Sequence, residues 1–511
     1  MNEPTSPQPQ ATFRELLDEI PGSRIARGAE TTVIHDVRHD SRDVKPGDCF
    51  VARRGQREDG LRFVNDAIAR GAGAILADRD VPGDVPLLCV PDPELALAIA
   101  SSTTWRHPSF TLEVVGITGT NGKTTTAWLI EYALEKLGNP TGLLGTVDHR
   151  FRDLRWSALH TTPEADDIAR RSAAMRDAGA THLVMEVSSH ALALKRAHAV
   201  RFRVAVLTNV TQDHLDFHGS FDVYADTKRS LFLERGPAVS VLNIDDAVGR
   251  SLIGRVTPAI TYSAKGAADA SLRVVESSFD ALGIRARVAT PHGEVALRSP
   301  LVGGHNLENL LAAFGALLAL DIPVRDAVDA LRDAAGAPGR LERVAVEAGA
   351  ANRPAVFVDY AHTPDALTRV LAALRATKPS RLICVFGCGG DRDPTKRAPM
   401  GASVAAGADV AILTTDNPRT EEPAAIAAMA EKGLVAGGTP RIEREQLDAS
   451  SRGYLVELDR RSAIALAISH ARAGDVILVA GKGHEPYQEV HGVRSPFDDR
   501  IEARNALQGG R

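Results

Sequence analysis

The chain has 511 residues, which is too long for one hydrophobic core and predicts roughly three domains of about 150 residues each. Its net charge is only −5, from 60 basic and 65 acidic side chains, so no charge field favours nucleic acid or an anionic membrane surface. No apolar run approaches the ~20 residues of a membrane helix, and four cysteines are too few for a disulfide framework. We therefore expect a monomeric cytoplasmic protein whose partners are small molecules, with no nucleic-acid or membrane partner.

The first segment, residues 11–109, is expected to form a small α/β domain after a polar, disordered tail over residues 1–10. The pattern predicts helices near 13–17, 63–69 and 95–104 and strands near 33–37, 49–52 and 74–77. Ser41 and Arg42 stand near a proline-glycine turn and suit a phosphate or pyrophosphate group. A solvated loop explains these two residues equally well.

The stretch from Leu112 to Thr126 predicts a strand, a phosphate-binding loop and a helix. Backbone N–H groups and the helix N-terminus favour an anion, Lys123 can reach terminal phosphates, and Thr124 can ligate magnesium. The glycines depart from the strict Walker spacing, but Gly-Lys-Thr after an apolar strand still predicts bound ATP. The expected contacts are Gly119, Thr120, Asn121, Gly122, Lys123, Thr124 and Thr125.

Two other apolar strands of the central segment, residues 110–338, end in polar loops. Residues 183–187 lead into Ser188, and residues 204–207 lead into a loop that contains His214. Ligands of a doubly wound sheet bind outside the carboxyl ends of its strands, so both loops should lie beside the phosphate loop. Glu186 and His214 are then candidate magnesium ligands. His214 and His218 would also suit zinc, but the oxygen-rich surroundings favour magnesium.

Residues 339–511 contain four strands that each lead into a polar loop, with the strands near 356–358, 382–386, 410–413 and 476–479. This repetition predicts a Rossmann-like domain whose loops form one mouth. No glycine fingerprint opens its first helix, so we expect no dinucleotide. A proline-glycine break before Arg340 predicts an interdomain hinge, from which Arg340 can reach ATP phosphates. Upstream, residues 272–297 predict a β-hairpin around Pro291 and Gly293.

The mouth of this last domain carries mixed charge, with Arg392 and Arg419 beside Asp416 and Glu485. Such a set suits a zwitterion, because arginine binds a carboxylate through two parallel hydrogen bonds and an acidic side chain accepts from an ammonium. A network of surface ion pairs explains the same charges equally well.

Taken together, the motifs resemble the ATP-dependent Mur ligases of peptidoglycan synthesis. The resemblance lies in the segments 119–125, 185–190, 208–209, 212–219 and 224–232 and covers nearly the whole chain. It implies an α/β fold of three domains: a small N-terminal α/β domain, a central P-loop domain with a mostly parallel sheet, and a C-terminal Rossmann-like domain. It also implies ATP-dependent amide formation through an acyl phosphate, with magnesium as the metal.

The resemblance assigns further residues. Ser41 would bind the uridine diphosphate of a UDP-N-acetylmuramoyl dipeptide, and the peptide would be bound by Thr161, Thr162, Ser188 and Arg196. Lys228 falls where the family carries a carbamylated lysine that holds a second magnesium, although an ordinary surface lysine fits the sequence too. Further ATP contacts would come from Asn306 and Asn309, one helical turn apart, and from Arg340 and Asp359.

The loop Asp416-Asn417-Pro418-Arg419 matches members of the family that select meso-diaminopimelate, whose distal carboxylate would pair with Arg419. The other expected pocket residues are Arg392, Gly481 and Glu485. Lysine lacks that carboxylate and would leave Arg419 unpaired, at a cost that can separate the two substrates. The family pattern is broken at Ala199 and Arg203, which stand for a glycine and an aspartate, and at His305, which stands for a phenylalanine.

Three alternatives stay open at this stage. One is a Mur ligase that adds L-lysine, and another is a folylpolyglutamate synthase-like ligase with a related ATP-binding core. The Asp40-Ser41-Arg42 motif and the 416–419 loop speak against the second. A different class, a nucleotide-switched binding protein, is favoured by nothing beyond the phosphate loop.

Overall fold

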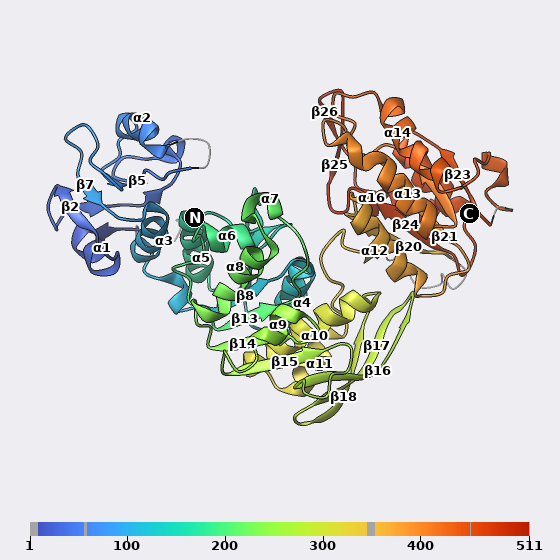
Figure 1. The fold of residues 1–511 in the computed structure, drawn as a ribbon, viewed down its shortest axis with the longest axis horizontal. Helices are drawn as coiled ribbons and strands as arrows, with labels where there is room; N and C mark the ends of the chain where they lie inside the picture. The colour runs from blue at the N-terminus through green and yellow to red at the C-terminus, as the bar shows by residue number, and fades with distance from the viewer. Residues whose placement is uncertain (1–8, 56–58, 345–352, 450, 510–511) are drawn as a thin grey trace. The chain divides into compact units, whose positions relative to one another are not determined.

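The computed structural model describes residues 9–55, 59–344, 353–449 and 451–509, which form three α/β domains, each built on its own sheet (Figure 1). The expected tail lies almost wholly outside the described residues. No helix in the described ranges is long and apolar enough to cross a bilayer. The predicted domain limits at 11–109, 110–338 and 339–511 stay predictions.

The N-terminal domain has a five-stranded sheet in the order β2-β7-β6-β5-β4, parallel except for β2. Its elements are β1 (Ala11–Thr12), α1 (Phe13–Glu19), β2 (Arg24–Arg27), β3 (Val33–Ile34), β4 (Val37–Arg38), β5 (Cys49–Val51), α2 (Val64–Ala69), β6 (Ala74–Ala77), β7 (Leu87–Cys89) and α3 (Pro93–Thr104). Local sequence explains the helix starts. Thr12 and Glu15 form a capping box for α1, and Asp92 caps α3 ahead of Pro93.

The central domain is organised around β8, which pairs in parallel with β12 on one side and β13 on the other. From one edge the first nine strands have the order β11-β10-β9-β12-β8-β13-β14-β15-β16. Seven neighbouring strands of this order are parallel, namely β9, β12, β8, β13, β14, β15 and β16. The elements are β8 (Glu113–Thr118), α4 (Lys123–Lys136), β9 (Thr141–Leu144), β10 (His149–Phe151), β11 (Leu154–Trp156), α5 (Ala165–Asp177), β12 (His182–Glu186), α6 (Ser189–Ala193), β13 (Val204–Leu207), α7 (Leu215–His218), α8 (Phe221–Leu233), β14 (Val239–Asn243), α9 (Ala247–Ser251), β15 (Ala259–Ser263), β16 (Leu272–Asp280), α10 (Gly304–Ala319) and α11 (Val324–Leu331). The strand, loop and helix predicted over residues 112–126 are confirmed.

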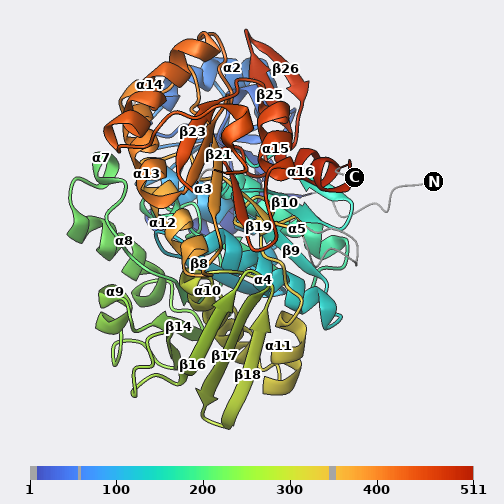
Figure 2. The same ribbon diagram turned by 90° about the vertical axis from the view of Figure 1, so that its right-hand side faces the viewer.

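The β-hairpin predicted over residues 272–297 is present in the second half of that segment. Strands β17 (Gly283–Thr290) and β18 (Gly293–Ser299) are antiparallel around Pro291 and His292 and lie side by side (Figure 2). The first half of the segment is instead a strand of its own, β16. The prediction missed the turn at Ala281-Leu282, because the single glycine that follows is a weak turn signal.

The C-terminal domain has a sheet in the order β19-β20-β24-β21-β22-β23, in which β20, β24, β21, β22 and β23 are parallel. Its elements are β19 (Glu342–Arg343), β20 (Ala355–Asp359), α12 (Pro364–Arg375), β21 (Leu382–Phe386), α13 (Arg397–Gly407), β22 (Val410–Leu413), α14 (Pro423–Ala436), β23 (Gly453–Val456), α15 (Arg460–Ser469), β24 (Val476–Ala480), β25 (Tyr487–Val490), β26 (Val493–Pro496) and α16 (Asp499–Gly509). All four predicted strands are present. Their apolar side chains are buried on both faces of the sheet, as parallel strands covered by helices require.

By packing, the chain divides into two compact units. Unit 1 comprises Met1–Arg273 with Leu311–Ala330, and unit 2 comprises Val274–Leu310 with Leu331–Arg511. Unit 1 therefore holds the N-terminal sheet and the phosphate loop, whereas unit 2 holds the C-terminal sheet. The two units are described separately below.

Candidate active site

The phosphate loop of unit 1 connects the end of β8 to the start of α4. Gly122 caps the helix with a positive φ of 86°, a conformation that glycine adopts without strain. Lys123 Nζ donates to the carbonyl oxygens of Gly119 at 2.9 Å and Thr120 at 3.0 Å. A Cβ at Gly119 would collide with Thr208 Oγ1, so only glycine allows the neighbouring loop to approach this closely.

The loop after β13 packs directly on the phosphate loop. Thr208 Oγ1 donates to the carbonyl of Asn121 at 2.6 Å, and the Asn121 amide donates to Asn209 Oδ1 at 3.1 Å. The Thr120 amide donates to the carbonyl of Asn209 at 2.6 Å. These contacts confirm the expectation that the loops after neighbouring parallel strands lie together.

Glu186, at the end of β12, is fully buried beside the helix that follows the phosphate loop. Its Oε2 accepts from Thr124 Oγ1 at 2.9 Å and from Thr146 Oγ1 at 3.0 Å, and its Oε1 accepts from the Thr146 amide at 2.8 Å. A buried carboxylate with two hydroxyls is the kind of oxygen-rich donor set that magnesium prefers. Glu186 and Thr124 are therefore together, as predicted.

His214 lies in an aromatic cluster. Its ring packs edge-on against His190, with centroids 4.8 Å apart, and against Tyr224 at 6.3 Å. Among the described residues, the hydrogen-bond partners of the Glu186 carboxylate are Thr124 and Thr146, and His214 does not contact it. The same residues contain no group of three or more His, Cys, Asp or Glu side chains that could hold a metal ion. The structure thus brings Thr124 to Glu186 but places His214 with the other histidines.

Lys228, on α8, is buried and is not the ordinary surface lysine that the sequence also allowed. Its Nζ donates to the carbonyl of Gly119 at 2.8 Å, the same oxygen that accepts from Lys123. Burial, reinforced by the Lys123 ammonium, lowers the pKa of Lys228 well below its usual value. A lowered pKa favours the neutral amine, which is the form that reacts with carbon dioxide in carbamylation.

Residues predicted to bind the nucleotide-linked peptide are joined by hydrogen bonds. Thr162 Oγ1 donates to the Glu186 carbonyl at 2.8 Å and accepts from the Ser188 amide at 3.0 Å. Arg196 Nη1 donates to the Thr162 carbonyl at 3.1 Å. Thr161 Oγ1 accepts from Thr146 at 3.1 Å, which links this group to Glu186.

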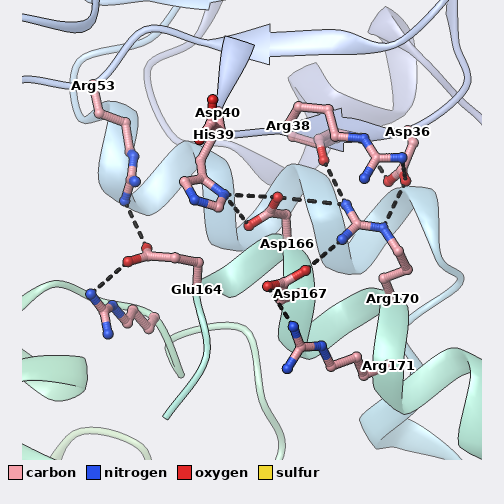
Figure 3. A network of polar contacts seen from close by, with 12 residues as sticks. Asp36, Arg38, His39, Asp40, Arg53, Glu164, Asp166, Asp167, Arg170 and Arg171 are labelled. Carbon is pink, nitrogen blue, oxygen red and sulfur yellow. Dashed lines mark hydrogen bonds and ion pairs between the residues drawn. The ribbon is translucent and has the colours of Figure 1, made fainter. Parts of the chain in front are cut away.

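A cleft of about 610 Å³ opens next to this group, within unit 1. Its lining includes His39, Arg53, Glu94, Glu164, His190 and Phe217. Figure 3 shows His39 and Arg53 pointing toward acidic side chains at the start of α5. His39 Nδ1 lies 2.8 Å from Asp166 Oδ1, and Arg53 Nη1 donates to Glu164 Oε2 at 2.9 Å. Glu164 also pairs with Arg196 at 2.5 Å, so the cleft is bordered by paired charges.

Ser41 is not among the residues that line this cleft, and its side chain is buried. Neighbouring Arg42 pairs with Asp40 and is exposed to solvent.

Of the residues that depart from the family pattern, Arg203 forms ion pairs with Glu113 and Asp321.

In unit 2, Asn306 and Asn309 are buried on the first turns of α10, one helical turn apart as predicted. Asn309 Nδ2 donates to Asn306 Oδ1 at 3.0 Å, and Asn306 Nδ2 donates to the carbonyl of Val302 at 2.9 Å. His305, the residue directly before Asn306, is exposed. The two amides thus form a fixed pair.

Asp359 ends β20 and is buried against the Arg340 segment. It accepts from the amides of Leu341 at 2.6 Å and Ala361 at 2.7 Å. Burial raises the pKa of Asp359 to about 6, although the Arg340 guanidinium opposes that rise. The Arg340 guanidinium lies 5.0 Å from the centre of the Tyr360 ring, which holds it beside the strand end.

The loops after β22 and β24 meet in the C-terminal mouth. Asn417 Nδ2 donates to Glu485 Oε2 at 2.8 Å, and Lys482 Nζ donates to Asn417 Oδ1 at 3.1 Å. Burial raises the pKa of Asp416, against the effect of Arg460 and Lys482. A Cβ at Gly481 would stand 3.0 Å from Asp416 Oδ2, so glycine there makes room for the carboxylate.

Arg419 and Arg392 differ in their surroundings. Arg419 Nη1 donates to the carbonyl of Gly390 at 2.5 Å, and its backbone has a positive φ of 52°, which is strained for a non-glycine residue. Arg392 is exposed. The mouth therefore brings together Asp416, Asn417 and Glu485, whereas Arg419 lies on the neighbouring Gly390 loop and Arg392 lies on the surface.

Sequence reasoning missed two residues of these sites. Thr146 follows an ordinary strand, and nothing in its local sequence marks it as a partner of Glu186. Lys482 lies in the recognised loop 480–485, but its complete burial was not foreseen. A lysine between two glycines and before a glutamate is a weak signal that only the fold makes specific.

Comparison with known proteins is consistent with this geometry. Three family models match: the Mur ligase family catalytic domain at residues 33–98, the Mur ligase middle domain at 117–317, and the Mur ligase glutamate ligase domain at 339–483. The chain belongs to the Mur ligase family, and it is a ligase of α/β fold with three domains.

Among its relatives are proteins named UDP-N-acetylmuramoyl-L-alanyl-D-glutamate–2,6-diaminopimelate ligase. That of Pseudomonas aeruginosa is 43% identical and covers 93% of this chain and 95% of its own; that of Streptomyces coelicolor is 43% identical and covers 99% of each. A solved structure of a ligase with this name has a TM-score of 0.74 at 32% identity, covering 98% of this chain and 99% of its own. A folylpolyglutamate synthase from Mycobacterium tuberculosis in complex with ADP shares the fold, with a TM-score of 0.56 at 21% identity over 76% of this chain and 92% of its own.

The pKa of Asp359 generates a prediction about stability. A carboxyl whose folded pKa is raised stabilises the folded state below its ordinary pKa of 3.8, and this contribution is lost as pH rises through about 6. We therefore expect the unfolding free energy of the wild type, relative to Asp359→Asn, to fall between about pH 4 and pH 6. Calorimetry of both proteins over this range measures it. A difference that is constant with pH would contradict the assignment.

Proposed function

We propose that this protein joins meso-2,6-diaminopimelate to UDP-N-acetylmuramoyl-L-alanyl-D-glutamate with ATP as the energy source, in peptidoglycan precursor synthesis. The observation that carries the proposal is the buried Glu186 at the phosphate loop, hydrogen-bonded to Thr124. The names of the full-length relatives support the pair of substrates. We also propose that it acts as a monomer in the cytoplasm, where ATP is available.

In the proposed reaction, the γ-carboxylate of D-glutamate attacks the γ-phosphorus of ATP and ADP leaves, giving an acyl phosphate. An amine of diaminopimelate then attacks the acyl carbon, and phosphate leaves as the amide forms. Lys123 and the N–H groups of residues 119–125 would stabilise the charge that develops on the transferred phosphoryl group. No side-chain nucleophile is needed.

Magnesium would neutralise phosphate charge during the transfer. Thr124 and Glu186 fit such an ion because their oxygens already face one another at 2.9 Å. We assign Lys228, once carbamylated, to a second ion, because carbamylation converts its buried amine into a carboxylate-like ligand. His214 would act as a further ligand.

The remaining sites follow from the same proposal. We assign ATP to Asn306, Asn309, Arg340 and Asp359 in addition to the phosphate loop. The UDP-linked peptide is assigned to Ser41, Thr161, Thr162, Ser188 and Arg196. Diaminopimelate is assigned to Arg392, Asp416, Asn417, Arg419, Gly481 and Glu485, where the carboxylate of one end would meet an arginine and its ammonium an acidic side chain.

The proposed activity predicts ADP release that requires both the uridine nucleotide and diaminopimelate. A coupled assay with each substrate omitted in turn, and with lysine or glutamate in place of diaminopimelate, measures it. Dependence on lysine would instead favour a lysine-adding ligase. Release without either substrate would favour a nucleotide-switched binding protein and contradict the proposal.

Lys228→Ala should reduce turnover by at least about a hundredfold, because it removes a ligand of the phosphoryl-transfer site. Added short carboxylates should restore part of the activity, since they can occupy the space of the carbamate. Lys136→Ala, which removes an exposed lysine of α4, is the matched control and should leave turnover unchanged. Full activity of Lys228→Ala would exclude the metal role.

Arg419→Ala should raise the KM for diaminopimelate by about tenfold or more and leave the KM for ATP nearly unchanged, because the distal carboxylate loses its charged partner. Steady-state kinetics with each substrate varied in turn separates the two effects. Arg441→Ala, an exposed arginine of the same domain, serves as the control. An equal change in both KM values would remove Arg419 from the amino-acid pocket.

A further inference from the structure

Lys482 is completely buried in the C-terminal mouth, and it is not one of the residues proposed to bind diaminopimelate. It follows β24 between Gly481 and Gly483, and its side chain has no exposure to solvent. A lysine is rarely buried without charged or polar partners, because removing its ammonium from water is unfavourable. What surrounds its Nζ therefore decides what it does.

The ammonium of Lys482 contacts three residues proposed to hold the amino-acid substrate. Its Nζ lies 3.1 Å from Asn417 Oδ1, 3.3 Å from Glu485 Oε2 and 3.8 Å from Asp416 Oδ1. Asn417 in turn donates to the same Glu485 oxygen at 2.8 Å. Lys482 is the shared partner that fixes the orientation of this amide and offsets the two carboxylates.

One acceptor in this cluster is left without a hydrogen bond. Asp416 Oδ1 is buried and has no hydrogen-bond partner among the residues that the structure describes, since Lys482 stands beyond hydrogen-bond range. A buried carboxylate oxygen without a donor is costly, so this atom is suited to accept from a bound group. An ammonium of the substrate is the group that a carboxylate oxygen accepts from most strongly.

The charges around Lys482 determine which groups the pocket favours. Asp416 and Glu485 are acidic, and Lys482 is the cation that lies next to both, so it offsets part of their negative charge before a substrate enters. Arg460 also acts on Asp416, but its pairing with Asp499 at 2.6 Å means that the two together add no net charge. A cation held at the carboxylates weakens the attraction of a lone ammonium more than that of a group with one ammonium and one carboxylate, which is neutral overall.

We propose that Lys482 is a specificity-determining residue that makes the pocket select a zwitterionic amino-acid end over a lone ammonium. This rests on the proposed function and deepens it, since it identifies what discriminates diaminopimelate from lysine besides Arg419. Without Lys482 the pocket gains one unit of negative charge. A lone ammonium, as at the end of a lysine side chain, then neutralises it better than a zwitterion does.

The test compares diaminopimelate and lysine as substrates of the full-length enzyme with ATP and the uridine nucleotide. In Lys482→Met, which keeps the length and apolar stem of the side chain, we expect the ratio of kcat/KM for diaminopimelate to kcat/KM for lysine to fall by about tenfold or more, with the KM for ATP unchanged. The charge-restoring variant Lys482→Met/Asp416→Asn should recover part of that ratio. Lys432→Met, an exposed lysine of α14, should leave it at the wild-type value.

The outcomes separate the two proposals. A wild-type enzyme that does not use diaminopimelate contradicts the proposed function itself. If the wild type uses it and Lys482→Met loses activity toward both substrates in equal proportion, with no recovery in the double variant, Lys482 is merely structural and the inference is wrong. If Lys482→Met does not fold, the Glu485→Gln variant tests the effect of pocket charge in the opposite direction, because it removes one negative charge. It should lower lysine use more than diaminopimelate use, and an unchanged ratio would overturn the proposal.

Discussion

The parallel pairing of β8 with β12 and β13 is the constraint on which the proposed catalytic centre depends. Because parallel strands in register end at the same edge, the phosphate loop, Glu186 and the 208–209 loop are brought together by backbone hydrogen bonds alone. Side chains then refine the arrangement. Glu186 accepts from Thr124, the first residue of α4 after Lys123, so the helix that presents its N-terminus to phosphate is tied to the neighbouring strand. A carboxylate placed in this way costs free energy to bury, and a cation bound in front of it would offset that cost.

Much of this could be predicted from the sequence, because the relevant signals are local. Apolar strands followed by glycine or polar loops identified β8, β12, β13 and four of the six described strands of the C-terminal sheet, and the Gly-Lys-Thr motif placed the phosphate loop. The turn at Ala281-Leu282 was missed because its residues carry no strong turn signal. The position of His214 could not be predicted either. Its ring packs on His190 and Tyr224, and no hydrophobic or turn pattern in the sequence encodes these ring contacts.

Burial is the property that the sequence failed to predict for charged residues, and it changes their chemistry. Lys228 was matched to a carbamylated lysine only by the resemblance and Lys482 was given no role, and neither burial followed from the local sequence, yet both side chains are almost completely buried. Their surroundings differ in sign. Lys228 is buried against a backbone carbonyl with the Lys123 ammonium nearby, and this burial, reinforced by Lys123, lowers its pKa. Lys482 instead lies next to two carboxylates and an amide oxygen. The same residue type is thus buried beside another cation in one unit and beside acidic groups in the other.

Lys482 also explains why the amino-acid pocket can be built on loops. Loops after β22 and β24 carry Asp416, Asn417 and Glu485, and without a common partner the buried Asp416 and the partly buried Glu485 would repel each other and spread these loops apart. Lys482 lies next to both, while the buried Arg460 donates to the carbonyls of Thr415, one residue before Asp416, and of Ala480, the last residue of β24. Two cations therefore preorganise the pocket. Arg460 fixes the backbone at Thr415 and Ala480, and Lys482 sets the charge next to the proposed ligand. Such division allows the charge preference of the pocket to change without loss of the strand geometry beneath it.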